Sequence, residues 1–409
     1  MKQVLQKLLL TLLASIAIGS TATAAVEIDG IWYTLYPSAG YAAIAPSPSA
    51  KLPLDSKGSL VYSESGDLII EGNSYAGNLR IPESVTYDGI DYRVRNIASF
   101  AFAGCPDLKS IELPKSIEWI ETSYANLFYG SDNITSIKID SDNEKFKSET
   151  GCILSADGES LYAVIPSCTG QFVVPSTVKI IRQWAFSGSK VTSIDIGMSV
   201  NIETGAFAYA DELESFIVNP SNNTYCLIDG MLVYSLAPNI PRILSCPAKK
   251  SGIVKTEISD WYTISDYAFA HCRKLTDISI NGNVLETGAC AFLGCTNLLD
   301  LKMSGDIGSD MLIGVTSLKH FTHTSNLLSD NDWSELRDMF HKYCPFLESI
   351  SIVKDGYTWE NGAIYYTDSK KKERWLQITP RGIKGDFEIV DNTNYISAEA
   401  FYKCSGITS

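Results

Sequence analysis

Residues 97–113 read Ile-Ala-Ser-Phe-Ala-Phe-Ala-Gly-Cys-Pro-Asp-Leu-Lys-Ser-Ile-Glu-Leu, and this stretch decides the fold. Its apolar spacing returns in full from Ile202 and from Ile264, and in altered copies elsewhere. A period of roughly 20 to 29 residues with apolar side chains at fixed slots is typical of a solenoid. Each coil of a solenoid buries one side only, so neighbouring coils must stack to complete a core. The altered copies begin at Ile181, Phe292, Ile307 and Ile396.

Three segments interrupt the coils with a different pattern. Each has an apolar strand, a polar turn and a second strand that ends at proline, as in Gly151–Leu154 followed by Pro166. This order is typical of a β-hairpin. We therefore expect a solenoid over residues 94–409. The last copy of the repeat stops at Ser409, before its strand. Either the natural C-terminus lies further on, or the last coil frays. The hairpin insertions are expected near 140–180, 219–263 and 353–395.

Residues 25–93 lack the repeat and are predicted to form an N-terminal β-rich cap. Ile31–Tyr33, Leu60–Tyr62 and Leu68–Ile70 are expected strands, and Tyr87–Tyr92 is an expected tight hairpin. A solenoid exposes core at its first coil unless another element covers it. The cap is well placed along the chain for that role.

One segment of the solenoid has the pattern of an amphipathic helix. Residues 332–340 place their large apolar side chains on one face, and Asp332 is the expected N-cap. We interpret this segment as a coil whose convex side has thickened. The apolar face holds Trp333, Leu336, Met339 and Phe340.

Residues 1–24 predict a secretory signal peptide. Lys2 and Lys7 precede an apolar stretch from Leu8 to Ile18, and Ala22–Ala24 is a small-residue cleavage site. No other stretch approaches the roughly 20 apolar residues of a membrane span. Removing the two lysines takes the formal charge from −14 to −16, which disfavours nucleic acid and anionic lipid as partners. We expect a secreted or cell-surface protein without membrane insertion, and leave the oligomeric state open.

Ten cysteines in an exported chain raise the question of disulfides. Four of them follow a repeat phenylalanine by three residues, and Ser189 and Ala210 hold the same slot in other copies. A slot that accepts Cys, Ser or Ala favours a small buried side chain over a bridge. The other six cysteines leave pairing open. The slot cysteines are Cys105, Cys272, Cys295 and Cys404.

The strand of each coil predicts two columns of outward-facing side chains. Side chains alternate across a strand, and stacking spaces equivalent positions about 4.8 Å apart. A hydroxyl-rich sheet can hydrogen-bond an extended protein or glycan. Alternatively, an exposed parallel sheet simply tolerates short polar residues, since neither column holds the aromatic anchor typical of binding hot spots. The candidate binding residues are Ser193, Ser215, Asp277, Asp300 and His320 in one column, and Asp195, Ser279 and Lys302 in the other.

Patterns that carry catalysis or metal binding are weak. His320 and His323 lie three residues apart on a strand and therefore face opposite sides, which prevents a shared metal. Asp140–Glu144 suggests a calcium loop, but Lys145 stands where such a loop needs Gly, and Gly151 where it needs Glu. A solvated turn is the favoured interpretation. We predict no catalytic residue, no metal site and no cofactor.

The stretch Ala101–Ile111, which reads Ala-Phe-x2-Cys-x2-Leu-x2-Ile, resembles the BspA-type leucine-rich repeat. The inserted hairpins and the entry segment Leu79–Gly89 look like the same family, and the resemblance covers roughly residues 57–409. It implies a leucine-rich-repeat solenoid with short parallel strands and an irregular convex side. It also implies a surface or secreted protein of a Bacteroides-like bacterium, of a kind often associated with adhesion. No catalytic residues come with it.

The sequence therefore predicts an exported, non-enzymatic protein that binds an extracellular protein or glycan through its repeat surface. Adhesion to host matrix or bacterial surface macromolecules is the expected role. The alternative is glycan capture for a nutrient-uptake system, with Trp32, Tyr33 and Tyr36 as a stacking platform. Burial of these rings would remove the main support for that alternative.

Overall fold

The computed structural model describes residues 22–56, 59–122, 127–235, 240–325 and 328–408. The predicted signal peptide lies outside the described residues except for residues 22–24. The chain divides into two compact units, one of residues 1–62 and 68–213 and one of residues 63–67 and 214–409. Among the residues that the structure describes, no helix has the length and apolar character that crossing a bilayer requires.

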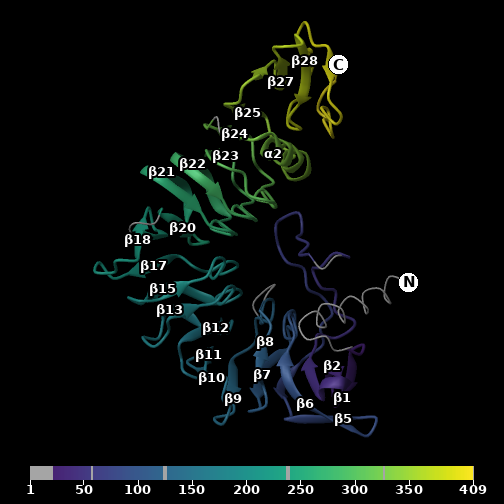
Figure 1. Ribbon diagram of the computed structural model, residues 1–409, viewed down its shortest axis with the longest axis vertical. Helices are drawn as coiled ribbons and strands as arrows, with labels where there is room; N and C mark the ends of the chain where they lie inside the picture. Colours follow the sequence, from purple (N-terminus) through teal and green to yellow (C-terminus); the bar gives the residue numbers. More distant parts are fainter. Residues whose placement is uncertain (1–21, 57–58, 123–126, 236–239, 326–327, 409) are drawn as a thin grey trace. The chain divides into compact units, whose positions relative to one another are not determined.

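The first unit combines an N-terminal sheet with the first coils (Figure 1). Its N-terminal sheet has the order β1-β2-β3-β6-β5, and a parallel sheet of order β4-β7-β9 follows. The strands are β1 (Val26–Ile28), β2 (Ile31–Tyr36), β3 (Tyr41–Ile44), β4 (Gly77–Arg80), β5 (Ser84–Tyr87), β6 (Ile90–Ile97), β7 (Leu108–Leu113), β8 (Trp119–Ile120), β9 (Ser136–Ile139), β10 (Phe146–Glu149), β11 (Cys152–Ser155), β12 (Ser160–Val164), β13 (Thr169–Val173), β14 (Ile180–Ile181), β15 (Lys190–Ile196) and β16 (Asn201–Ile202), with the 3-10 helix η1 (Pro37–Ala39).

The N-terminal block differs from expectation between β3 and β4. The predicted strands Leu60–Tyr62 and Leu68–Ile70 are wrong, because this region forms only isolated bridges such as Tyr62↔Leu68. Proline cannot donate to a strand ladder, and Pro46, Pro48 and Pro53 interrupt the neighbouring chain. The tight hairpin forms as predicted between β5 and β6, with both turn residues, Asp88 and Gly89, at positive φ.

The second unit is built on an eight-stranded sheet of order β18 to β25, in which β20 to β25 are parallel (Figure 1). A four-stranded sheet of order β26-β27-β28-β29 follows. The elements are β17 (Ser215–Val218), β18 (Tyr225–Ile228), β19 (Met231–Tyr234), β20 (Arg242–Ser245), β21 (Ser251–Ile264), β22 (Lys274–Thr287), β23 (Asp300–Met303), β24 (His320–His323), α2 (Asp330–Tyr343), β25 (Ser349–Ile352), β26 (Tyr357–Glu360), β27 (Ala363–Asp368), β28 (Glu373–Ile378) and β29 (Tyr395–Ile396).

The interrupting segments are antiparallel. In each of the triplets β10-β11-β12, β18-β19-β20 and β26-β27-β28, the second and third strands form the hairpin read from the sequence, and one further strand precedes it. The last strand of each triplet then pairs in parallel with a later strand of the chain. The hairpins therefore join the stack of coils through ordinary backbone pairing.

The repeat phenylalanines form the core of the coils. Phe102 and Phe186 in the first unit, and Phe269 and Phe292 in the second, are fully buried. Phe269 and Phe292 stack at 5.4 Å between ring centroids. The sequence spacing thus indicates correctly which residues fill the space between successive coils.

The predicted helix is α2, but its predicted start is wrong. Ser329 is the N-cap, since its side chain accepts a hydrogen bond from the Asp332 backbone at 3.1 Å. Asp332 in turn accepts from the Ser329 backbone at 2.9 Å, which completes a capping box. The apolar face is buried as predicted, and Phe340 packs against Phe321 with ring centroids 5.0 Å apart.

Candidate binding surface

Strands β22 to β25 present one face to the core and the other to solvent. The inward side chains of Ile278, Leu301, Phe321 and Ile350 are buried. The residues between them point the other way and are exposed or half-buried. The alternation places polar side chains in rows across the strands, since parallel pairing keeps equivalent positions opposite one another.

The first row holds two acids, a histidine and a serine. Asp277 pairs with Asp300, Asp300 with His320, and His320 with Ser349, each on the adjacent strand. We call these four residues the acid–histidine row. His320 Nδ1 lies 2.8 Å from Ser349 Oγ. Thr276 Oγ1, beside the row, donates to Asp277 Oδ2 at 2.6 Å. Hydrogen bonds therefore hold the side chains at both ends of the row, Asp277 and Ser349.

The second row lies two residues further along the same strands. Ser279 pairs with Lys302, Lys302 with Thr322, and Thr322 with Ser351. Lys302 is exposed. The face therefore offers hydroxyl groups, one ammonium group and the carboxylates of the acid–histidine row, which suits polar and charged contacts more than apolar ones.

The two carboxylates of the acid–histidine row influence each other. Partial burial raises the pKa of Asp300, the charge of His320 acts in the opposite direction, and the negative charge of Asp277 raises the pKa further. Two carboxylates side by side are unfavourable when both are ionised. A cation bound to this row would relieve that repulsion.

The structure brings together five of the eight predicted site residues: Asp277, Ser279, Asp300, Lys302 and His320. Ser215 lies on β17, outside the eight-stranded sheet. Ser193 and Asp195 lie on β15 in the first unit, opposite Gln171 and Val173. The eight residues are therefore distributed over more than one sheet, and the acid–histidine row is the part with the most chemistry.

Thr276 is a polar residue of this face that the column pattern missed. It precedes Asp277 and reaches it sideways, which alternation along a strand does not predict. His320 and His323 do face opposite sides, since His323 is buried with Nε2 2.8 Å from the Gly305 carbonyl oxygen. Within the described part of the chain, no three His, Cys, Asp or Glu side chains gather in a way that could hold a metal ion.

The Asp140–Glu144 turn has a structural role. Asn143 is buried, and its amide Nδ2 donates to the carbonyls of Pro114 and Ile117 at 3.1 and 3.0 Å. Its Oδ1 accepts from the backbone of Lys145 and Phe146 at 2.9 and 2.8 Å. The side chain thus ties β9 and the following hairpin to the preceding coil.

The aromatic residues of the N-terminal sheet are mostly buried. Of the three rings proposed as a stacking platform, Tyr33 and Tyr36 are 0% and 2% exposed, and Trp32 is partly accessible. Tyr36 stacks on Tyr41 with ring centroids 4.4 Å apart. These rings therefore do not form an open platform for sugars.

Comparison with known proteins identifies the family to which the repeats are similar. The family described as BspA type Leucine rich repeat region matches in six copies over residues 76–151, 167–227 and 249–371. A search of curated proteins found no match. A leucine-rich repeat protein from Eubacterium ventriosum ATCC 27560 is 14% identical, with 95% of this chain and 96% of that chain covered and a TM-score of 0.43.

Two further solved structures are similar. A leucine rich cell surface protein from Faecalibacterium prausnitzii A2-165 is 15% identical, with 94% of this chain and 93% of that chain covered and a TM-score of 0.33. A leucine-rich repeat protein from Bacteroides ovatus ATCC 8483 is 17% identical, with 93% and 92% covered and a TM-score of 0.31.

Proposed function

Because the chain belongs to the BspA-type leucine-rich repeat family, we propose that it is an exported binding protein that recognises an extracellular macromolecule through its exposed strand face. Residues 1–24 would act as the signal peptide, and the mature chain would be secreted or held at the cell surface. Its role is adhesion or recognition, without catalysis. The acid–histidine row is the observation that carries the proposal, since a repulsive pair of carboxylates on an exposed sheet favours a partner that supplies positive charge.

The partner that fits best is a protein with basic side chains. Arg and Lys hydrogen-bond carboxylates, and stacking offers them Asp277 and Asp300 on adjacent strands about 4.8 Å apart. The adjoining hydroxyls of Ser279 and Ser349 could hydrogen-bond the partner's backbone. Glycan capture is less well supported, because Tyr33 and Tyr36 are buried.

A binding screen with charge-reversed variants tests this proposal. The mature chain is probed on an array of host matrix proteins and polysaccharides at physiological salt. We expect saturable binding to a protein, weakened by added salt and by Asp277→Lys with Asp300→Lys. The matched control is Asp306→Lys with Glu335→Lys, which makes the same change of charge at exposed acids away from the face. Equal binding by both double variants would place the site elsewhere, and binding to glycans alone would favour capture.

A further inference from the structure

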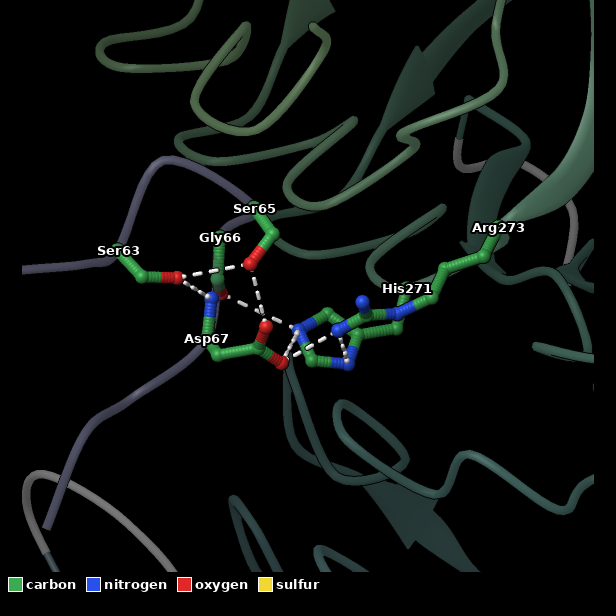
Figure 2. A network of polar contacts seen from close by, with 6 residues as sticks. All are labelled: Ser63, Ser65, Gly66, Asp67, His271 and Arg273. Atoms are coloured by element: carbon green, nitrogen blue, oxygen red, sulfur yellow. Dashed lines mark hydrogen bonds and ion pairs between the residues drawn. The ribbon is translucent and has the colours of Figure 1, made fainter.

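A short turn, Ser63–Asp67, belongs to the second unit although its neighbours in sequence belong to the first. It contacts residues on three successive coils. Figure 2 shows the turn facing His271 and Arg273, with the Asp67 side chain directed towards both. His271 and Gly66 are 205 residues apart in sequence. We call the surface beneath the turn, made by His271, Arg273, Gly294 and Gly314, the glycine groove.

The floor of the glycine groove is a column of residues with left-handed backbone. His271, Gly294 and Gly314 each lie two positions after the large apolar residue of their coil, with φ values of 60°, 70° and 74°. A Cβ on Gly314 would come within 2.8 Å of the Gly66 nitrogen, and one on Gly66 within 2.7 Å of the Gly294 nitrogen. The backbones of turn and coils therefore meet at a distance that only glycine permits.

The wall of the groove recognises polar groups of the turn. His271 is buried, and its Nε2 lies 3.2 Å from the Gly66 carbonyl oxygen. A carbonyl oxygen can only accept, so Nε2 carries the hydrogen. Arg273 Nη2 lies 3.4 Å from His271 Nδ1 and forms an ion pair with Asp67. The groove therefore contacts one carbonyl group and one carboxylate.

The turn holds its own shape. Its hydrogen bonds run from the Gly66 backbone to the Ser63 carbonyl at 3.0 Å, and from the Asp67 backbone to Ser63 Oγ at 2.9 Å. Ser65 Oγ donates to Asp67 Oδ2 at 2.7 Å, which leaves Oδ1 for Arg273. Glu64 is exposed. The glycine groove thus contacts a glycine, which has no side chain, and the aspartate that follows it on a tight turn.

We propose that the glycine groove is a binding site for glycine–aspartate turns of protein partners, and that residues 63–67 occupy it as a built-in competitor. The groups that the groove contacts are present in any turn that ends in Gly-Asp. A partner's turn must displace residues 63–67 from the groove. The apparent affinity of the chain for the partner is therefore its intrinsic affinity multiplied by the fraction of molecules in which the groove is open. This site uses the coil turns and is independent of the acid–histidine row.

The test uses a cyclic peptide as the probe. The peptide carries residues 62–68 with cysteines at both ends, closed by a disulfide in place of the Tyr62↔Leu68 bridge. The receptor is the full chain with Asp67→Arg, which turns the ion pair of its own turn into a repulsion. We expect the peptide to bind this variant at least about tenfold more tightly than the wild type, measured by calorimetry. Peptides with Gly66→Ala or Asp67→Asn should bind at least about tenfold more weakly than the parent peptide.

Two further variants separate recognition from loss of structure. Arg273→Ala, added to the Asp67→Arg chain, should abolish binding, whereas Arg242→Ala, which removes an exposed arginine of the same unit, should not. In a charge-swap experiment, Arg273→Asp should bind the Asp67→Arg peptide and not the parent peptide, an outcome that unfolding cannot produce. The proposal is overturned if the opened chain binds no peptide, or binds all of them equally.

Discussion

Asp277 and Asp300 lie directly opposite each other on the parallel strands β22 and β23. Parallel pairing of coils gives the two carboxylates no freedom to separate along the strands, so the repulsion between them is built into the register. Burial and the charge of Asp277 raise the pKa of Asp300, while the charge of His320 acts against this shift. The fold thus holds two like charges together on adjacent strands of one face.

Asp300→Asn should stabilise the protein at neutral pH. A carboxyl group whose pKa is raised by folding contributes stability that is fully present below its ordinary pKa of about 3.9 and is lost as the pH rises through the raised value. The wild type therefore carries the unfavourable pair at pH 7, and the amide does not. We expect Asp300→Asn to have a higher Tm than the wild type at pH 7. The gain in the free energy of unfolding should be roughly a few tenths of a kcal/mol. The melting temperatures of the two proteins should converge near pH 3.

Asp306→Asn is the matched control, because Asp306 is exposed and lies outside the paired strands. Its melting curve should follow that of the wild type at both pH values. A lower Tm for Asp300→Asn at pH 7 would show that attraction to His320 outweighs the repulsion from Asp277.

The coils and the rows could be predicted because they depend on local spacing. Buried side chains such as Phe102 and Phe269 recur at fixed intervals, and an inward residue fixes which of its neighbours face outward. The sequence alone therefore places Asp277 and Asp300 in one column. Ser193 and Ser215 lie in a different sheet from Asp277 and Asp300, and this depends on where the hairpins interrupt pairing, which spacing alone does not give.

The glycine groove could not be predicted from the sequence. Ser63–Asp67 belongs to no repeat, and its contacts with His271 and Arg273 join residues 205 and 206 positions apart. His271 stands at the slot that Gly104, Gly188, Gly294 and Gly314 hold in other coils, but Tyr209 and Lys403 hold this slot too. All of these residues have positive φ, so a non-glycine residue at the slot does not by itself indicate a contact with a distant turn.

The buried cysteines Cys105, Cys295 and Cys344 should be unreactive in the folded protein. Burial raises the pKa of Cys105 to about 11, and it also raises the pKa of Cys295 and Cys344. Alkylation requires the thiolate, so iodoacetamide at pH 8 should modify these residues only after unfolding. Burial raises the pKa of Cys168 as well, but this thiol is partly exposed, so it should react in the native state, more slowly than after unfolding. Mass spectrometry of peptides after timed labelling measures each site, and fast native labelling of Cys295 would contradict its burial.

Ser329→Ala should shorten or loosen α2. The substitution removes the acceptor for the Asp332 backbone, and N-cap losses cost about 1 kcal/mol. Ser334→Ala is the control, since Ser334 is an exposed position inside the helix where alanine is favourable. Urea denaturation followed by circular dichroism should show a lower midpoint for Ser329→Ala alone. An unchanged midpoint would mean that the packing of Trp333 and Phe340 holds the helix without its cap.

Asn143→Ala should destabilise the first unit more than an ordinary surface change. Its side chain makes four hydrogen bonds to backbone groups, two as donor and two as acceptor, in a buried position. Alanine leaves these groups unsatisfied, at a cost of roughly 1–3 kcal/mol. Asn143→Asp should also destabilise, because a carboxylate would face the carbonyls of Pro114 and Ile117. The control is Asn133→Ala, an exposed asparagine with one hydrogen bond to the Pro106 carbonyl. Thermal melts should rank both Asn143 variants below Asn133→Ala, and equal melting temperatures would show that solvent replaces the lost hydrogen bonds.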